Sequence, residues 1–386
     1  MSRSVSAPEH AAPRGLVVCA GGKRYFTCAW VLVSLLRHHG FGLPIELWHR
    51  GPGELDQGMA DLIATKGVTV RDAAALMNPE DLATPEALRL AAITASDFDQ
   101  IISIDADCAP LGDLTALFSW QDYLTSGLLL FPDDNEIQAD DAVWQAIGLA
   151  PRCNPGVDSG IVVIDRTRRS DVLAAARTLV PRIAAVTPPG RRPVSSLLMA
   201  ALAGIGPFSA APYPPFQVEH DLVHRGEDGE AFVQHRRTSK WHLGGQDRET
   251  PSPEATDIAR RSLDELGRLW SGAIFTPPTR SDAAKGIEDE LAARRHFVYQ
   301  SADGGWRRLD LHRGGRIGEG RNDFEQHWAV VERAGRPVLQ FYSDIRLAIE
   351  FERLADGTWR GASCGPPGFA ARLAAADCPG LLVTVP

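Results

Sequence analysis

The stretch FDQIISIDADCAPLGDLTALF, residues 98–118, sets a largely apolar run directly before two carboxylates. Residues 101–104 suit a buried strand, and Asp105 and Asp107 follow at its end. Alternation along an extended chain places residues 105 and 107 on one side, where both carboxylates can share a divalent cation. In an open α/β sheet, ligands bind beyond the carboxyl ends of the strands. The paired acids therefore predict a ligand-binding edge.

Apolar runs alternate with helical periodicity on both sides of this stretch. Short apolar runs at 16–20, 45–49 and 68–73 precede helical segments, and later runs at 126–131 and 159–165 suit central strands. Strands separated by helices favour βαβ units and a mainly parallel sheet. We expect an α/β fold of Rossmann type.

The character of the chain changes after about residue 276. Residues 276–290 are typical of a linker, and 291–386 carry short alternating runs punctuated by Gly, Asp and Asn, which predict a small antiparallel β domain, barrel or sandwich. Residues 1–14 are expected to be a disordered lead and 15–275 the α/β domain. The aromatic residues of the β domain can either stack on sugars or, more commonly, pack into the core: Trp306, Trp328, Tyr342 and Trp359.

Composition excludes several classes of protein. The 386 residues are 44% hydrophobic, enough for a sizeable core, and the net charge of −9 gives no reason to expect a nucleic-acid partner. No window approaches the roughly 18 consecutive apolar residues of a membrane span, and the N-terminus lacks a signal-peptide core. Six scattered cysteines without C-x-x-C pairs indicate reduced thiols rather than a zinc site. We expect a cytoplasmic protein without a transmembrane segment.

The D-x-D tripeptide is a weak signal by itself, since the chain repeats it at 97–99 in a segment expected to face solvent. Its context is more specific, because an apolar strand precedes it and Asp-Leu at 113–114 opens the next helix. In this context the segment resembles the metal-binding motif of glycosyltransferases of the GT-A fold. The resemblance implies Mn²⁺, or Mg²⁺, bound by Asp105 and Asp107, with Ala106 beside the donor.

The start of the α/β domain, GLVVCAGGKRYFTCAW at 15–30, resembles the nucleotide-binding start of the fungal-type α-mannosyltransferase group and its bacterial relatives. The resemblance runs over about residues 15–270. Glycines at a strand tip let the backbone approach a ligand closely, although a plain tight turn is the alternative. Neither G-x-G-x-x-G nor G-K-[ST] is present. The resemblance implies donor contacts from Cys19, Ala20, Gly21, Gly22, Lys23 and Tyr25.

Two further segments match the same group. Arg89 stands where that group carries a lysine pointing toward the donor, the alternative being an exposed helix arginine. Asp158 and Ser159, with Gly160 giving a close approach, stand at the entry of a strand that contacts the donor sugar, although Asp158 can also be a turn residue.

A histidine and a lysine complete the implied site. His235 is followed five residues later by Lys240, and the resemblance assigns them to the metal and the diphosphate. Two carboxylates and an imidazole form a mixed oxygen and nitrogen set that Mn²⁺ accepts. The implied catalytic residues are Lys240, Arg89 and Asp158.

One departure from the group concerns the acceptor side. Where the group carries Gly-Asp-Lys followed by an acid before a helix, this chain reads GRRPVSS at 190–196, without a carboxylate. Three explanations stay open: Asp133 or Asp134 serves the acceptor, Arg191 and Arg192 bind an anionic acceptor, or catalysis has been lost.

The sequence therefore predicts a metal-dependent glycosyltransferase that moves a hexosyl group from a nucleoside-diphosphate sugar to a glycan or other hydroxyl acceptor. The resemblance implies GDP-mannose as a candidate donor and retention at the anomeric carbon. The first alternative is an inactive protein that binds sugar nucleotides or glycans. The second is a nucleotidyltransferase, whose glycine-rich basic loop is not evident at residues 19–25.

Overall fold

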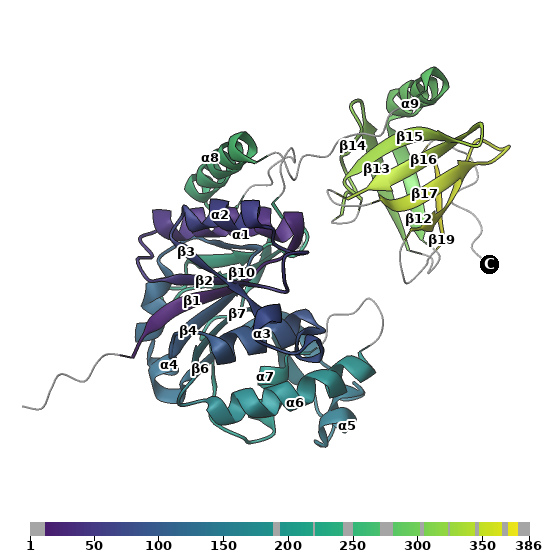
Figure 1. Cartoon of the computed structure of the whole chain (residues 1–386). Helices are drawn as coiled ribbons and strands as arrows, with labels where there is room; N and C mark the ends of the chain where they lie inside the picture. The colour runs from purple at the N-terminus through teal and green to yellow at the C-terminus, as the bar shows by residue number, and fades with distance from the viewer. Residues whose placement is uncertain are drawn as a thin grey trace, which may run out of the picture. The chain divides into compact units, whose positions relative to one another are not determined.

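The computed structural model describes residues 12–187, 194–218, 221–241, 250–270, 281–301, 305–322, 325–343, 347–364 and 370–376. The chain divides into two compact units (Figure 1). The first unit runs to Arg237 and resumes with the helix that ends at Leu269. The second unit takes residues 238–241 and the chain from Trp270 onward.

The first unit is built on a seven-stranded sheet in the order β3-β2-β1-β4-β7-β6-β8. The first four of these strands are parallel, whereas β7 runs antiparallel to both β4 and β6. The strands are β1 (Arg14–Cys19), β2 (Ile45–His49), β3 (Val68–Asp72), β4 (Gln100–Asp105), β6 (Leu128–Ile137), β7 (Asn154–Asp165) and β8 (Ser209–Ala210).

A second, four-stranded sheet in the order β5-β11-β10-β9 continues from the end of β4. β5 begins only three residues after β4 ends, and β11 pairs with it antiparallel so that His235 lies opposite Cys108. This pairing brings the end of β11 beside the D-x-D segment. The strands are β5 (Cys108–Pro110), β9 (Phe216–Val218), β10 (Asp221–Arg225) and β11 (Ala231–His235).

Helices cover both faces of the large sheet, with α1, α2 and α8 on one side and α3, α6 and α7 on the other (Figure 1). α1 is apolar along most of its length because it lies between the sheet and α8, where Trp30 Nε1 donates to the Ser262 carbonyl at 3.0 Å. The helices are α1 (Gly22–His38), α2 (Gln57–Ala64), α3 (Pro85–Ala95), α4 (Gln121–Ser126), α5 (Val143–Ile147), α6 (Ser170–Val186), α7 (Ser196–Leu202) and α8 (Pro253–Leu269).

The mainly parallel α/β sheet expected from the sequence is confirmed, with some shifted boundaries. α1 begins at Gly22, earlier than the position near residue 27 that apolar periodicity favours, because extended Gly21 takes the N-cap position. Arg14, assigned by the sequence to the disordered lead, belongs to β1. Residues 1–11 of that lead lie outside the described residues. None of the described helices combines the length and apolar character needed to cross a bilayer.

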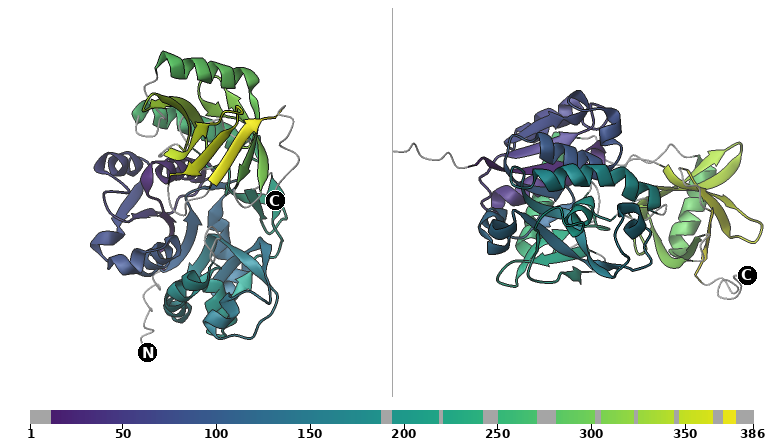
Figure 2. Two further views of the ribbon diagram at one scale, coloured as in Figure 1. Left: turned by 90° about the vertical axis from the view of Figure 1, so that its right-hand side faces the viewer. Right: turned by 90° about the horizontal axis from the view of Figure 1, so that it is seen from below.

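The second unit contains a closed barrel of eight antiparallel strands, so the expected β domain is confirmed as a barrel (Figure 2). Part of the expected linker, residues 282–290, instead forms the start of α9 (Asp282–Arg294), and 271–280 lie outside the described residues. The strands are β12 (His296–Ser301), β13 (Trp306–His312), β14 (Arg316–Ile317), β15 (His327–Arg333), β16 (Arg336–Tyr342), β17 (Leu347–Arg353), β18 (Trp359–Ser363) and β19 (Ala370–Ala375).

The barrel core is apolar and aromatic. Alternate residues of most barrel strands join one cluster, as Leu339 and Phe341 do on β16. Trp328 and Trp359 belong to this cluster and are each 2% exposed, whereas Trp306 is 66% exposed. These tryptophans therefore form no common face for stacking on a sugar.

Candidate active site

The carboxyl ends of β1 and β4 lie side by side. Cys19 and Asp105, the last residues of these strands, are partners across the parallel ladder. α1 begins three residues after Cys19, so its amino end, with exposed Lys23 and Tyr25, follows directly from this edge. A helix amino end carries partial positive charge and unpaired N–H groups that attract anions. The predicted strand tip is therefore a strand-to-helix junction next to the paired acids.

The two glycines of the junction have different roles. Gly22 has a φ of +73°, a conformation that residues with a Cβ rarely adopt. A Cβ on Gly21 would clash with the carboxylate of Glu54, whose backbone oxygen accepts from the Gly22 N–H at 2.6 Å. Both glycines thus shape the junction, and Ala20 before them is buried.

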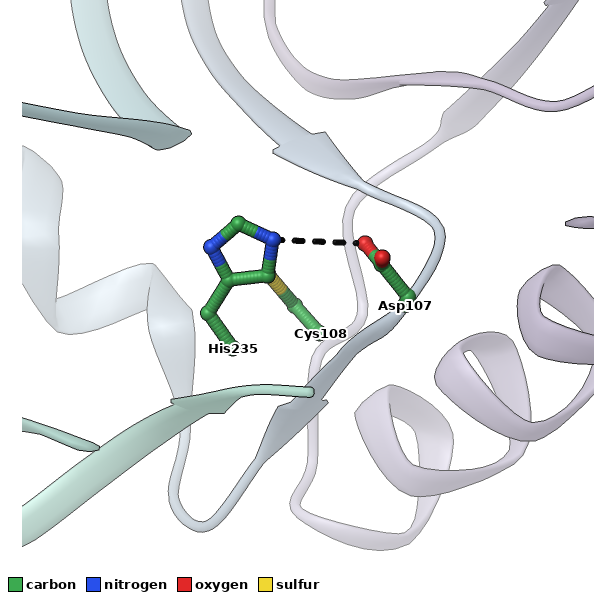
Figure 3. A group of neighbouring side chains, drawn as sticks. All are labelled: Asp107, Cys108 and His235. Atoms are coloured by element: carbon green, nitrogen blue, oxygen red, sulfur yellow. Dashed lines mark ion pairs between the residues drawn. The ribbon is translucent and has the colours of Figure 1, made fainter. Parts of the chain in front are cut away.

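Asp107, Cys108 and His235 form a buried cluster of potential metal ligands (Figure 3). Their ligand atoms all lie within 4.8 Å of one another. Nε2 of His235 is 3.5 Å from Oδ1 of Asp107 and 3.8 Å from Oδ2 of Asp105. All three residues predicted to bind the metal therefore converge at one point.

Asp158 orients His235 from the other side of the ring. Nδ1 of His235 lies 2.8 Å from Oδ1 of Asp158, and Nε2 of His224 lies 2.7 Å from Oδ2 of the same carboxylate. The Gly160 N–H also donates to Asp158 at 2.9 Å. The carboxylate is 3% exposed and saturated by these donors. Its structural role is to hold His235 with Nε2 facing the acid pair.

Gly160 makes room for the His235 ring. A Cβ at this position would clash with Nδ1 and two carbons of the imidazole, and no side chain can be accommodated while the ring stays in place. The close approach that the sequence assigned to the donor is thus made by a side chain of this protein, while Ser159 beside it is half-buried.

The charges of the cluster are strongly coupled. Burial by itself lowers the pKa of His235, but the carboxylates of Asp158 and Asp107 outweigh it and raise the pKa to about 10. Burial would raise the pKa of Asp158, yet the His235 charge and the bonds from both imidazoles hold it well below its usual range. Without a cation, an imidazolium is therefore the stable partner of these carboxylates.

Arg89 is buried, so the alternative of an exposed helix arginine is wrong. It projects from α3, is 7% exposed, and forms an ion pair with Oδ1 of Asp105. Burial would lower the pKa of Arg89, but Asp105 and Glu86 raise it further above its usual range. Within the described residues its Nη1 has no hydrogen-bond partner. Arg89 holds one oxygen of Asp105 while the other faces His235.

Asp133 and Asp134 lie in an irregular part of β6, where the register with β7 shifts between Pro132 and Glu136. Arg237 binds both, at 3.2 Å to Asp133 Oδ1 and 2.9 Å to Asp134 Oδ1. Burial, together with its bond to Asp134, raises the pKa of Asp133 to about 6. Residue 131, two positions before this pair, is the strand partner of Asp158, so the pair flanks the buried cluster.

Three further predicted residues fall outside the described part of the first unit. Lys240 is 8% exposed and falls in residues 238–241, which group with the second unit. Arg191 and Arg192 lie outside the described residues. The acceptor explanation that rests on these arginines stays a prediction.

Sequence reasoning missed Cys108 and His224. Cys108 directly follows the acid pair, and its thiol donates to the Gly160 carbonyl at 3.5 Å. His224, 1% exposed, follows two buried apolar residues of β10, and a buried polar side chain of this kind needs a partner. Their partners, Gly160 for Cys108 and Asp158 for His224, both lie on β7, far from them along the chain.

The donor set fits a hard or borderline divalent cation. Carboxylate oxygens suit Mg²⁺ and Mn²⁺, and the imidazole adds a nitrogen that Mn²⁺ accepts. Burial and the neighbouring Asp107 raise the pKa of the Cys108 thiol well above its usual range, which disfavours the thiolate that softer metals select. The single described group of three potential ligands can thus hold a metal ion.

Comparison with known proteins gives a family match over part of the chain. Residues 13–149 match the sequence family described as "Mannosyltransferase putative". A search of curated proteins found no significant match.

The similar solved structures include the galactosyltransferase LgtC with donor and acceptor sugar analogues (18% identity, TM-score 0.37, 51% of this chain and 73% of that one). An active-site mutant of LgtC matches at 16% identity and TM-score 0.40, over 70% of this chain and 99% of that one. GlyE of Streptococcus pneumoniae TIGR4 matches at 14% identity and TM-score 0.43, over 74% and 72% of the two chains. The first unit thus has a mixed, mostly parallel α/β sheet, and residues 13–149 within it match the family described as "Mannosyltransferase putative".

Proposed function

We propose that the protein is a metal-dependent, retaining hexosyltransferase that takes mannose from a nucleoside-diphosphate donor such as GDP-mannose and delivers it to a hydroxyl of a glycan or similar acceptor. The observation that carries this proposal is the convergence of Asp105, Asp107 and His235 at the carboxyl edge of the sheet. The mannosyltransferase-family match over residues 13–149 supports the choice of sugar.

Asp107, His235 and the Oδ2 oxygen of Asp105 would hold Mn²⁺, or Mg²⁺. A bound divalent cation neutralises the donor diphosphate and favours the charge that develops on it as the sugar leaves. Asp158 fixes the imidazole through Nδ1 so that Nε2 faces the acid pair. Arg89 holds the remaining oxygen of Asp105 and keeps that carboxylate in place.

The amino end of α1 would receive the donor phosphates. The helix dipole of α1 and the exposed Lys23 would supply positive charge at the edge where Asp105 ends β4. Tyr25, 41% exposed, offers an aromatic face to the nucleoside.

Asp133 and Asp134 would line the acceptor side. Arg237 and Gln217 hold Asp134, while Asp133, with its pKa of about 6, is the group of this pair that can exchange a proton near neutral pH. In a retaining transfer the leaving phosphate can itself accept the acceptor proton. The absence of a carboxylate at 190–196 is then compatible with turnover.

The test is a mass-spectrometric transfer assay with a panel of nucleotide sugars, in Mn²⁺ or in EDTA. We expect GDP-mannose to be consumed only with the cation, and Asp107→Asn to abolish transfer because it removes a charged ligand. Asp97→Asn is the matched control, since Asp97 belongs to the upstream D-x-D and only pairs with Arg71 at the surface.

Unchanged turnover in EDTA and in Asp107→Asn would refute the metal assignment. Donor binding without transfer to any acceptor would favour the inactive binding protein. Release of pyrophosphate from nucleoside triphosphates would favour a nucleotidyltransferase.

A further inference from the structure

A groove of about 650 Å³ lies between the end of α1 and α8, outside the site described above. Its lining includes five basic side chains and a single carboxylate, in a chain whose net charge is −9. These are Arg37, His38, Lys66, Arg261, Arg268 and Glu265.

The groove is remote from the carboxyl edge of the sheet. α1 starts at that edge with Gly22 and ends at His38, and its 17 residues span about 25 Å at the rise of an α-helix. Lys66 lies just before β3 begins, which places it at the amino ends of the parallel strands. A ligand in the groove would therefore occupy a site separate from Asp105.

Two of the basic groups are held in place by the fold. The guanidinium of Arg37 donates to the carbonyls of Phe41 at 2.6 Å and Leu43 at 2.9 Å, which fix its position without cancelling its charge. Lys66 Nζ lies 2.9 Å from Oε2 of Glu265 and 4.1 Å from the centroid of the Trp30 ring. This ordering reduces the entropy lost when an anion binds.

Arg261 and Arg268 supply positive charge to the groove. They are seven residues apart on α8, two turns along one face, and hence about 10 Å apart along the axis. Both are exposed, and within the described part of the chain no hydrogen bond or ion pair engages either of them. Their neighbour Arg260 does not line the groove and approaches Asp257 at 3.6 Å.

Helix-end electrostatics explain only part of this pattern. Arg37, His38 and Arg268 lie in the last turns of their helices, where positive charge offsets the helix dipole. Arg261 lies in the middle of α8, and Lys66 lies beyond the end of α2. Their convergence on the same groove needs another reason.

We propose that this groove binds a phosphate-bearing polyanion, with separate phosphate groups at Arg261 and Arg268. Guanidinium groups bind phosphate oxygens through paired, charge-assisted hydrogen bonds. The spacing of the two arginines selects a ligand with more than one anionic group over a single phosphate. Such a ligand is either a soluble oligophosphate or the headgroups of an anionic lipid surface.

The experiment measures binding of sodium tripolyphosphate by calorimetry in EDTA, and flotation with phosphatidylcholine vesicles with and without phosphatidylserine. Wild type, Arg261→Gln, the double variant Arg261→Gln/Arg268→Gln and the matched control Arg260→Gln are compared, each after circular dichroism confirms folding. We expect the double variant to bind about tenfold more weakly, the sum of two exposed charge contacts. Arg260→Gln should bind as wild type does.

The two probes distinguish the sources of phosphate. Binding of tripolyphosphate alone identifies a soluble ligand, whereas binding of the phosphatidylserine vesicles alone identifies a lipid surface. The proposal is overturned if neither probe binds, or if Arg260→Gln weakens binding as much as Arg261→Gln, because the latter result would show only general attraction to α8.

Discussion

The carboxyl edge of the first sheet and the interior of the barrel are both buried, but the buried side chains are charged at the sheet edge and apolar in the barrel. At the sheet edge Asp107, Asp158, His224 and His235 are each no more than 4% exposed, and the charged groups are paired. The barrel core cluster consists of apolar and aromatic side chains.

This difference indicates that the sheet edge is a functional site and that the barrel core serves stability. Burying charges costs free energy even when they are paired, so a group of them persists where it serves chemistry. An apolar barrel core lowers the free energy of the folded state directly. Among the described residues, the cluster of three potential metal ligands lies in the first unit, so we assign catalysis there and packing to the barrel aromatics.

The largest expected effect is loss of barrel stability in Phe351→Ala. Phe351 is fully buried and packs against Phe341 with ring centroids 4.9 Å apart, and removing a core phenyl ring costs about 3–5 kcal/mol. Hydrogen exchange with mass spectrometry should show the opening free energy of β16 and β17 falling by this amount. Equal loss of protection in β1 and β4 would contradict the separation of the two units.

A smaller effect is expected from Asp158→Asn, which keeps the size of the side chain and removes its charge. His235 then loses the carboxylate that orients Nδ1, and loss of such a partner typically lowers metal affinity about 10- to 100-fold. Electron paramagnetic resonance titration of Mn²⁺ measures the change. Asp165→Asn, at the opposite end of β7, is the control and should bind Mn²⁺ as wild type does. Unchanged affinity in Asp158→Asn would show that His235 needs no orienting partner.

A pH dependence of stability in EDTA is also expected from the charge on His235. The pKa of His235 is raised from 6.5 to about 10 in the folded protein, so the folded state binds more protons than the unfolded state between these values. Its contribution to the free energy of unfolding is complete below pH 6.5 and is lost as pH rises through 10. Urea unfolding should therefore show the gap between wild type and His235→Gln narrowing over this range. A gap that stays constant would mean that His235 is neutral in the folded state.

Several elements of the first unit could be predicted from the sequence because their signals are local. The apolar run before Asp105 has clear length and occurs as expected, as β4. The acid pair with His235 was also predictable, but through resemblance to other enzymes. Spacing along the chain could not show that residues 107 and 235 meet.

The roles of Asp158, Gly160 and Arg89 were not predictable, because each depends on a neighbour distant in sequence. The resemblance assigned Asp158 to the donor site. In the structure its two oxygens contact the imidazoles of His224 on β10 and His235 on β11. Arg89 was assigned to the donor, with an exposed helix arginine as the alternative, whereas in the structure α3 packs it against Asp105.

The sequence by itself determined where strands end in ligand-type residues and where the α/β pattern gives way to short antiparallel strands, since side-chain periodicity and turn residues act over a few positions. Tertiary structure alone decided which of those residues share a site. The antiparallel pairing of β5 with β11 sets His235 opposite Cys108, and Gly160 leaves the space that its ring fills. Strand register and close packing bring together residues far apart in the chain, and neither can be predicted from the residue spacing within one segment.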